Sequence, residues 1–108
     1  MNDRELLEDA AKAAGSIDYY KVTPAGLLLK GGGIWSPLLD DGDALRLAVK
    51  LHLDVCQQIA VADTADVPGA IAVAPLRRAA FEPHGTDPYA ATRRAIVRSA
   101  AEIGRSME

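Results

Sequence analysis

Three carboxylates, Asp40, Asp41 and Asp43, form the densest group of potential metal ligands in the sequence. Clustered carboxylate oxygens can bind Mg²⁺ or Ca²⁺. The spacing of a calcium-binding loop, which needs a glutamate at its twelfth position, is absent. The three residues also precede a run with the pattern of a helix, where carboxylates cap free backbone N–H groups and interact well with the helix dipole. We therefore expect helix capping, with a metal-dependent enzyme as the less favoured alternative.

His52 and Cys56 lie four residues apart, and a Cys–His pair can act as nucleophile and base. No third residue that would orient the histidine and no glycine-rich turn that would form an oxyanion hole accompanies them. We expect Cys56 to be a small buried residue where the chain leaves a helix, and His52 to act as a cation near the end of that helix.

Glu82, His84 and Asp87 could bind a metal or supply acid–base groups. They fall in a polar segment, residues 76–87, and Asp87 precedes Pro88 in the pattern of a helix start, so we expect a surface loop. Gly31–33 lacks the lysine and hydroxyl residue of a phosphate-binding loop, and a turn or bulge is expected there. No catalytic, cofactor-binding or metal-binding residue is assigned, and no cofactor is expected.

Five arginines in the second half of the chain form its only basic concentration. A patch on the last helix could contact phosphates, so a nucleic-acid-associated factor that uses Arg93, Arg94 and Arg98 is an alternative function. The formal net charge is −3 and aromatic residues make up 5% of the chain, which is not typical of a nucleic-acid-binding domain. We expect a solvated face that can pair with Asp40–Asp43. The residues concerned are Arg77, Arg78, Arg93, Arg94 and Arg98.

Composition indicates one globular domain over residues 1–108. Hydrophobic residues make up 49% and charged residues 25%, and the mean hydropathy is +0.02, which excludes a largely disordered or fibrous chain. A single cysteine excludes an intrachain disulfide framework and fits a reducing compartment. No apolar run approaches the roughly 18 residues of a membrane span, so no membrane association is expected.

Apolar spacing predicts three helices, over residues 2–14, 42–54 and 88–104. Asn2 or Asp3 can cap the first, and Gly15 can end it. Short apolar runs predict strands at 26–30, 34–35, 57–62 and 70–74, and Trp35 is expected as a core anchor beneath the second helix.

Bulky and alanine side chains alternate in the last two of these strands, which indicates a sheet with both faces dry. The predicted class is α+β. We expect an α/β/α sandwich in which a small, mostly antiparallel sheet of 3–4 strands carries three helices on its two faces.

Two segments, residues 35–51 (WSPLLDDGDALRLAVKL) and 91–104 (ATRRAIVRSAAEIG), together resemble the phage ABA-sandwich domain, a family of small bacteriophage and prophage proteins of uncharacterised function. The resemblance covers roughly residues 25–105. It implies helix–sheet–helix layering, no catalytic motif, and a location in the cytoplasm of the bacterial host.

We therefore expect a small phage or prophage accessory protein that is non-enzymatic and acts through protein contacts. Short strands leave sheet edges exposed, and self-association is a common remedy. A homodimer is predicted, with the last helix or a sheet edge at the interface, or a complex with another phage or host protein.

Overall fold

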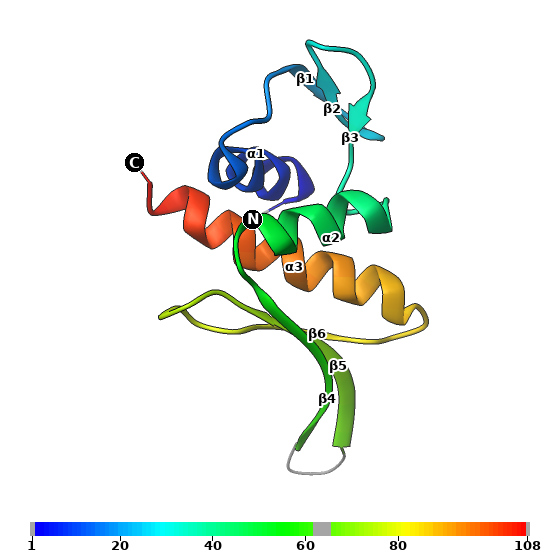
Figure 1. The fold of residues 1–108 in the computed structure, drawn as a ribbon. Coiled ribbons are helices and arrows are strands. Elements are labelled where there is room, and N and C mark those ends of the chain that lie inside the picture. Colours follow the sequence, from blue (N-terminus) through cyan, green and yellow to red (C-terminus); the bar gives the residue numbers. More distant parts are fainter. Residues whose placement is uncertain (1, 62–65, 108) are drawn as a thin grey trace.

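The computed structural model describes residues 2–61 and 66–107. Figure 1 shows three helices lying between two antiparallel sheets. The elements follow the order α1 (Asp3–Ala14), β1 (Tyr19–Thr23), β2 (Gly26–Leu29), β3 (Ile34–Trp35), α2 (Asp41–Lys50), β4 (Asp54–Val61), β5 (Asp66–Val73), β6 (Ala80–Pro83) and α3 (Pro88–Arg105).

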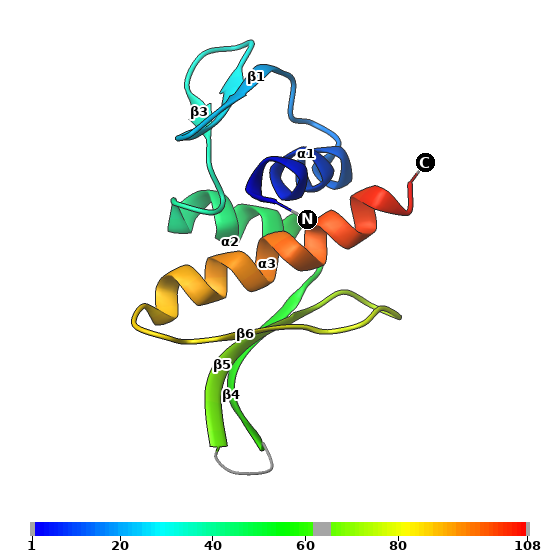
Figure 2. The ribbon, with the colours of Figure 1, turned by 180° about the vertical axis from the view of Figure 1, so that it is seen from behind.

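The α+β class, the three helices and the small antiparallel sheets are confirmed, but the order of the layers differs from the expected one. The strands form two sheets, β1-β2-β3 and β4-β5-β6, instead of one sheet between helices. Figure 2 shows the same layering from behind, with helices in the middle. Short connections let each set of three consecutive strands pair with itself, and α2 separates the two sets.

Each helix begins where its side-chain cap was predicted. Asn2 accepts a hydrogen bond from the backbone N–H of Glu5, Asp40 from that of Asp43, and Asp87 from those of Tyr89 and Ala90. Gly15 ends α1 with a φ of 77°, in the left-handed region that glycine tolerates.

Helix α2 is shorter than predicted, because it ends at Lys50 and not at residue 54. His52 adopts a left-handed φ of 57°, and the N–H of Leu53 returns to the carbonyl of Ala48 at 2.9 Å. This turn closes the helix, so β4 begins at Asp54, three residues before the predicted strand. The predicted end of that strand, residue 62, lies outside the described residues.

Two strands of the structure, β1 and β6, were not predicted from the sequence. The run Tyr19–Thr23 forms β1 despite the following Pro24, which lies in the turn to β2. The segment 76–87, expected to be a loop, contains β6, which pairs with β5.

The buried core is made largely of small residues where the helices meet. Ala10 and Ala11 of α1, and Ala100 and Ala101 of α3, are almost fully buried. The same cluster includes Trp35 from the first sheet, so its predicted core role is confirmed.

The sheet β4-β5-β6 buries only one face in the described part of the chain, so the expectation of two dry faces is wrong. Ala70 and Ala72 are buried on the face toward α3. The opposite face carries Cys56, Ile71 and Phe81, which pair across the three strands. Cys56 is exposed there, because it lies within β4 and not at a helix exit.

Candidate interaction surfaces

The aspartates that precede α2 serve as structural partners. Asp40 caps the helix, and Asp43 accepts hydrogen bonds from the backbone N–H of Ser36 at 2.9 Å and from Arg46 at 2.7 Å. Asp41 forms an ion pair with Arg93 at 2.6 Å. Capping and the pairing with arginine are thus confirmed. Within residues 2–61 and 66–107, no group of three histidine, cysteine, aspartate or glutamate side chains could hold a metal ion.

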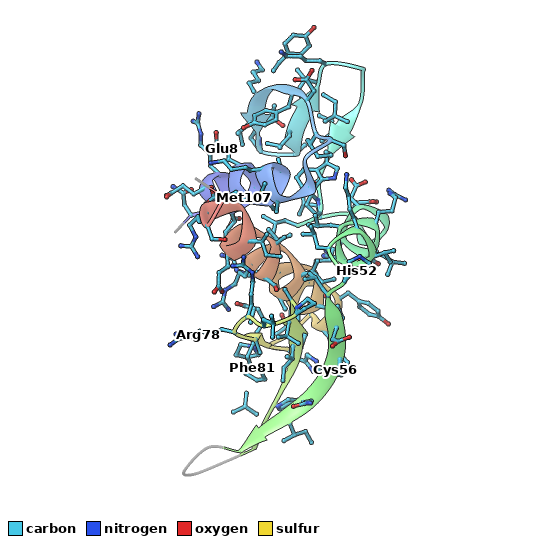
Figure 3. All side chains as sticks on the ribbon, turned by 60° about the vertical axis from the view of Figure 1, so that its left-hand side comes forward. Glu8, His52, Cys56, Arg78, Phe81 and Met107 are labelled. Atoms are coloured by element: carbon cyan, nitrogen blue, oxygen red, sulfur yellow. The ribbon has the colours of Figure 1, made fainter. Side chains whose placement is uncertain are left out.

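The other candidate catalytic residues are not brought together. Figure 3 shows His52 beside α2 and Cys56 farther along β4. Asp87 caps α3, and Glu82 forms an ion pair with Arg98. His84 instead bonds to Gln57 of β4, at 2.6 Å from Nε2 to Oε1.

A short polar chain therefore runs from His84, the residue after β6, through Gln57 to Thr92 of α3. The Gln57 amide nitrogen donates to the Thr92 hydroxyl at 3.0 Å, which leaves its Oε1 facing His84 Nε2. All three residues of this chain line an apolar groove.

The apolar groove is bounded by α2, β4 and the first half of α3, and has a volume of about 440 Å³. Ala44, Val55 and Ile96 line it together with the exposed Leu45 and Tyr89. Val49 lies one helical turn after Leu45 and is 67% exposed. Ile59 lies four residues after Val55, on the same face of β4, and is 62% exposed. An apolar surface of this kind, rimmed by polar groups, is typical of an interaction site.

The groove adjoins the free edge of β4. This strand has eight residues that pair with β5 without a register shift, and Asp54–Ile59 are all exposed. Its single charged residue, Asp54, is the first residue, and it contains no proline.

The other three sheet edges of the described chain are each protected. Edge strand β1 has a register shift between Tyr19 and Lys21, and β3 has only two residues. Edge strand β6 ends at Pro83, and Arg98 donates a hydrogen bond to the Phe81 carbonyl at 3.0 Å. Short strands, bulges, charges and proline are the common means of preventing edge pairing, and β4 has none of them along its middle.

The arginines of α3 lie on two sides of the helix. Arg93 is largely buried and also donates to the Leu38 carbonyl at 2.9 Å, so it joins α3 to the start of α2. Arg94 forms an ion pair with Asp3, and Arg98 with Glu82. The three residues of the nucleic-acid hypothesis therefore do not form one free basic surface.

A second cavity, of about 540 Å³, lies on the β6 side of α3. Arg94 and Arg98 are joined there by Arg78 and Arg105. Arg78 belongs to the basic group expected from the sequence, whereas Arg105 was missed; its spacing from Arg94 and Arg98 on one helix was the available signal.

Tyr19 connects the first sheet to α1. Its hydroxyl donates to Glu8 at 3.5 Å, and burial together with the Glu8 carboxylate raises the pKa of Tyr19 above its ordinary value of 10.0. The phenol therefore stays protonated at neutral pH and acts as a structural contact.

Comparisons with known proteins identify no relative. No family model, no curated protein and no solved structure matches this chain. Among the described residues, no helix combines the length and the apolar character needed to cross a membrane. The resemblance to the phage ABA-sandwich domain remains a prediction, and the observed order of layers differs from the helix–sheet–helix order that it implies.

Proposed function

We propose that this protein is a non-enzymatic interaction module that acts as a homodimer, with the free edge of β4 at the interface. The observation that carries the proposal is the open, uninterrupted edge of β4 beside an apolar groove. A role as a phage or prophage accessory protein in the bacterial cytoplasm is proposed on the resemblance of residues 35–51 and 91–104 alone.

A second copy of the chain is the partner that suits this edge best. Two β4 strands related by a twofold axis perpendicular to the sheet run antiparallel, so each satisfies the free N–H and C=O groups of the other. The twofold axis passes between one residue of β4 and the same residue in the second copy of the chain. Directly opposite residues share one face of a sheet, so the faces toward α3 become continuous in the dimer.

The apolar residues of β4 select one register. With Gln57 on the axis, Val55 faces Ile59 of the partner subunit, and the same pair forms twice by symmetry. Placing Cys56 or Gln58 on the axis would instead set Gln57 opposite one of these apolar residues. Val55 and Ile59 are 38% and 62% exposed in the single chain, so the first register covers both.

The oligomeric state tests the proposal directly. Light scattering coupled to size exclusion should give about 22.8 kDa, twice the 11.4 kDa of one chain. Ile59→Lys should shift the protein toward the monomer, because it places two charges at the interface. Leu39→Lys is the matched control, since Leu39 is 64% exposed, lies in the turn before α2 and does not line the groove beside β4. A monomeric wild-type protein at concentrations of tens of micromolar would overturn the proposal.

Single cysteines in a Cys56→Ser background test the register. Gln57→Cys should form a disulfide-linked dimer under mild oxidation, because opposite Cβ atoms lie within disulfide reach. Val55→Cys alone should not, whereas a mixture of Val55→Cys and Ile59→Cys chains should give the mixed dimer. A stable dimer without these cross-links would refute the pairing through β4 and leave self-association intact.

A further inference from the structure

The cavity on the β6 side of α3 concentrates positive charge on an otherwise acidic chain. Arg94, Arg98, Glu102 and Arg105 follow one another at spacings of four, four and three residues, so they lie along one side of α3. Arg78, on the loop between β5 and β6, also lines this cavity; Figure 3 shows its place on that loop.

The carboxylates in and beside the cavity do not neutralise all of its arginines. Four guanidinium groups and two carboxylates, Glu82 and Glu102, line it, and Asp3 pairs with Arg94 from outside, so 4 − 3 leaves a local excess of one positive charge. The chain as a whole has a net charge of −3. Glu82 binds Arg98, and its other oxygen lies 3.9 Å from Arg94. Within the described residues, the side chains of Arg78 and Arg105 have no ion-pair or hydrogen-bond partner.

Guanidinium groups with free N–H donors favour a ligand that carries phosphate oxygens. Their planar forks bind phosphate oxygens in pairs, and several forks around one cavity can hold a tetrahedral group. The volume of about 540 Å³ suits a compact molecule. An extended polyanion would reach beyond the cavity to the neighbouring Asp3, which repels it.

We propose that this cavity binds a compact ligand that carries a phosphate group, with Arg78 and Arg105 as its principal contacts. Arg94 and Arg98 are held in place by Asp3 and Glu82 and supply the remaining positive field. The cavity lies at the β6 side of the second sheet, whereas the proposed dimer uses the β4 edge, so the two proposals stand independently.

Thermal unfolding in the presence of anions tests this site. Inorganic phosphate and pyrophosphate at about 10 mM should raise the melting temperature more than chloride at the same ionic strength, because a ligand that binds only the native state stabilises it. A nucleoside monophosphate distinguishes a nucleotide ligand from free phosphate. Equal melting temperatures in all these salts would overturn the proposal.

Substitutions locate the binding. Arg78→Gln and Arg105→Gln should each weaken pyrophosphate binding, measured by calorimetry, about tenfold, since each removes a charge-assisted contact. Arg77→Gln is the matched control, because Arg77 is exposed on the same loop and does not line the cavity. Equal affinity in all three variants would refute the site. Tighter binding of a single-stranded oligonucleotide than of pyrophosphate, with a steep salt dependence, would refute a compact ligand.

Discussion

Replacing Gly104 by alanine should destabilise the protein strongly, although alanine is the better helix former. A Cβ atom at this position would lie 1.8 Å from the Asp9 carbonyl oxygen and 2.7 Å from its carbonyl carbon. Both atoms belong to the backbone of α1, so no side-chain rotation relieves the overlap. Helix α1 would have to move away from α3, which opens a contact lined by Ala10, Ala11, Ala100 and Ala101.

The magnitude follows from two opposing effects. In an exposed helix, glycine to alanine stabilises by about 1 kcal/mol. Overpacking a dense contact costs about 1–3 kcal/mol and occasionally more, and here the obstacle is rigid backbone, so the cost should exceed that range. A net loss of about 2–3 kcal/mol lowers the melting temperature of a domain of this size by about 10–20 °C.

Circular dichroism during heating, at one fixed protein concentration, measures this effect. Gly31→Ala is the control, because an added Cβ there meets nothing within 4 Å and its φ lies outside the left-handed region. Its stability should change by less than about 0.5 kcal/mol. If Gly104→Ala melted at or above the wild-type temperature, the close approach of α1 and α3 would be wrong.

Three further predictions concern the contacts that hold the layers together. Asp87→Ala should lower the free energy of unfolding in urea by about 1 kcal/mol, because it removes the cap of α3; an unchanged midpoint would contradict this role. Arg93→Ala should lower the free energy of unfolding more than Asp41→Ala, since Arg93 is 15% exposed and also donates to the Leu38 carbonyl. Asp41 is 71% exposed, so its loss should cost about 0.2–1 kcal/mol. Equal losses would show that only the ion pair contributes to stability. The raised pKa of Tyr19 means that its contribution to stability is complete below its ordinary pKa of 10.0 and is lost as the pH rises through the higher folded value. Tyr19→Phe should therefore lose less stability than the wild type between neutral pH and about pH 11, and parallel pH profiles would contradict this.

The features predicted correctly from the sequence depend on neighbouring residues. Asn2, Asp40 and Asp87 each bond to backbone N–H groups two or three residues away, so the cap and the helix start are encoded in the same short segment. The pairing of the Asp40–Asp43 group with arginine was also anticipated, since opposite charges were abundant on both segments.

The candidate sites depended on contacts that no local pattern contains. The distribution of bulky and alanine residues in β4 and β5 predicted two dry faces, but the register pairs Ile71 with Cys56, and Ile59 lies on the alanine side. Strand β6 was hidden because its short, mixed sequence acquires strand structure only by pairing with β5.

By itself, the sequence determined the class and the helix starts, because these follow from hydrogen bonds and periodicities within a few residues. Only the tertiary structure decided that the helices lie between two sheets, that the β4 edge is open, and that Arg78 and Arg105 share a cavity. The physical reason is that layer order, edge exposure and charge convergence depend on which distant segments pack together, and several packings are compatible with the same local preferences.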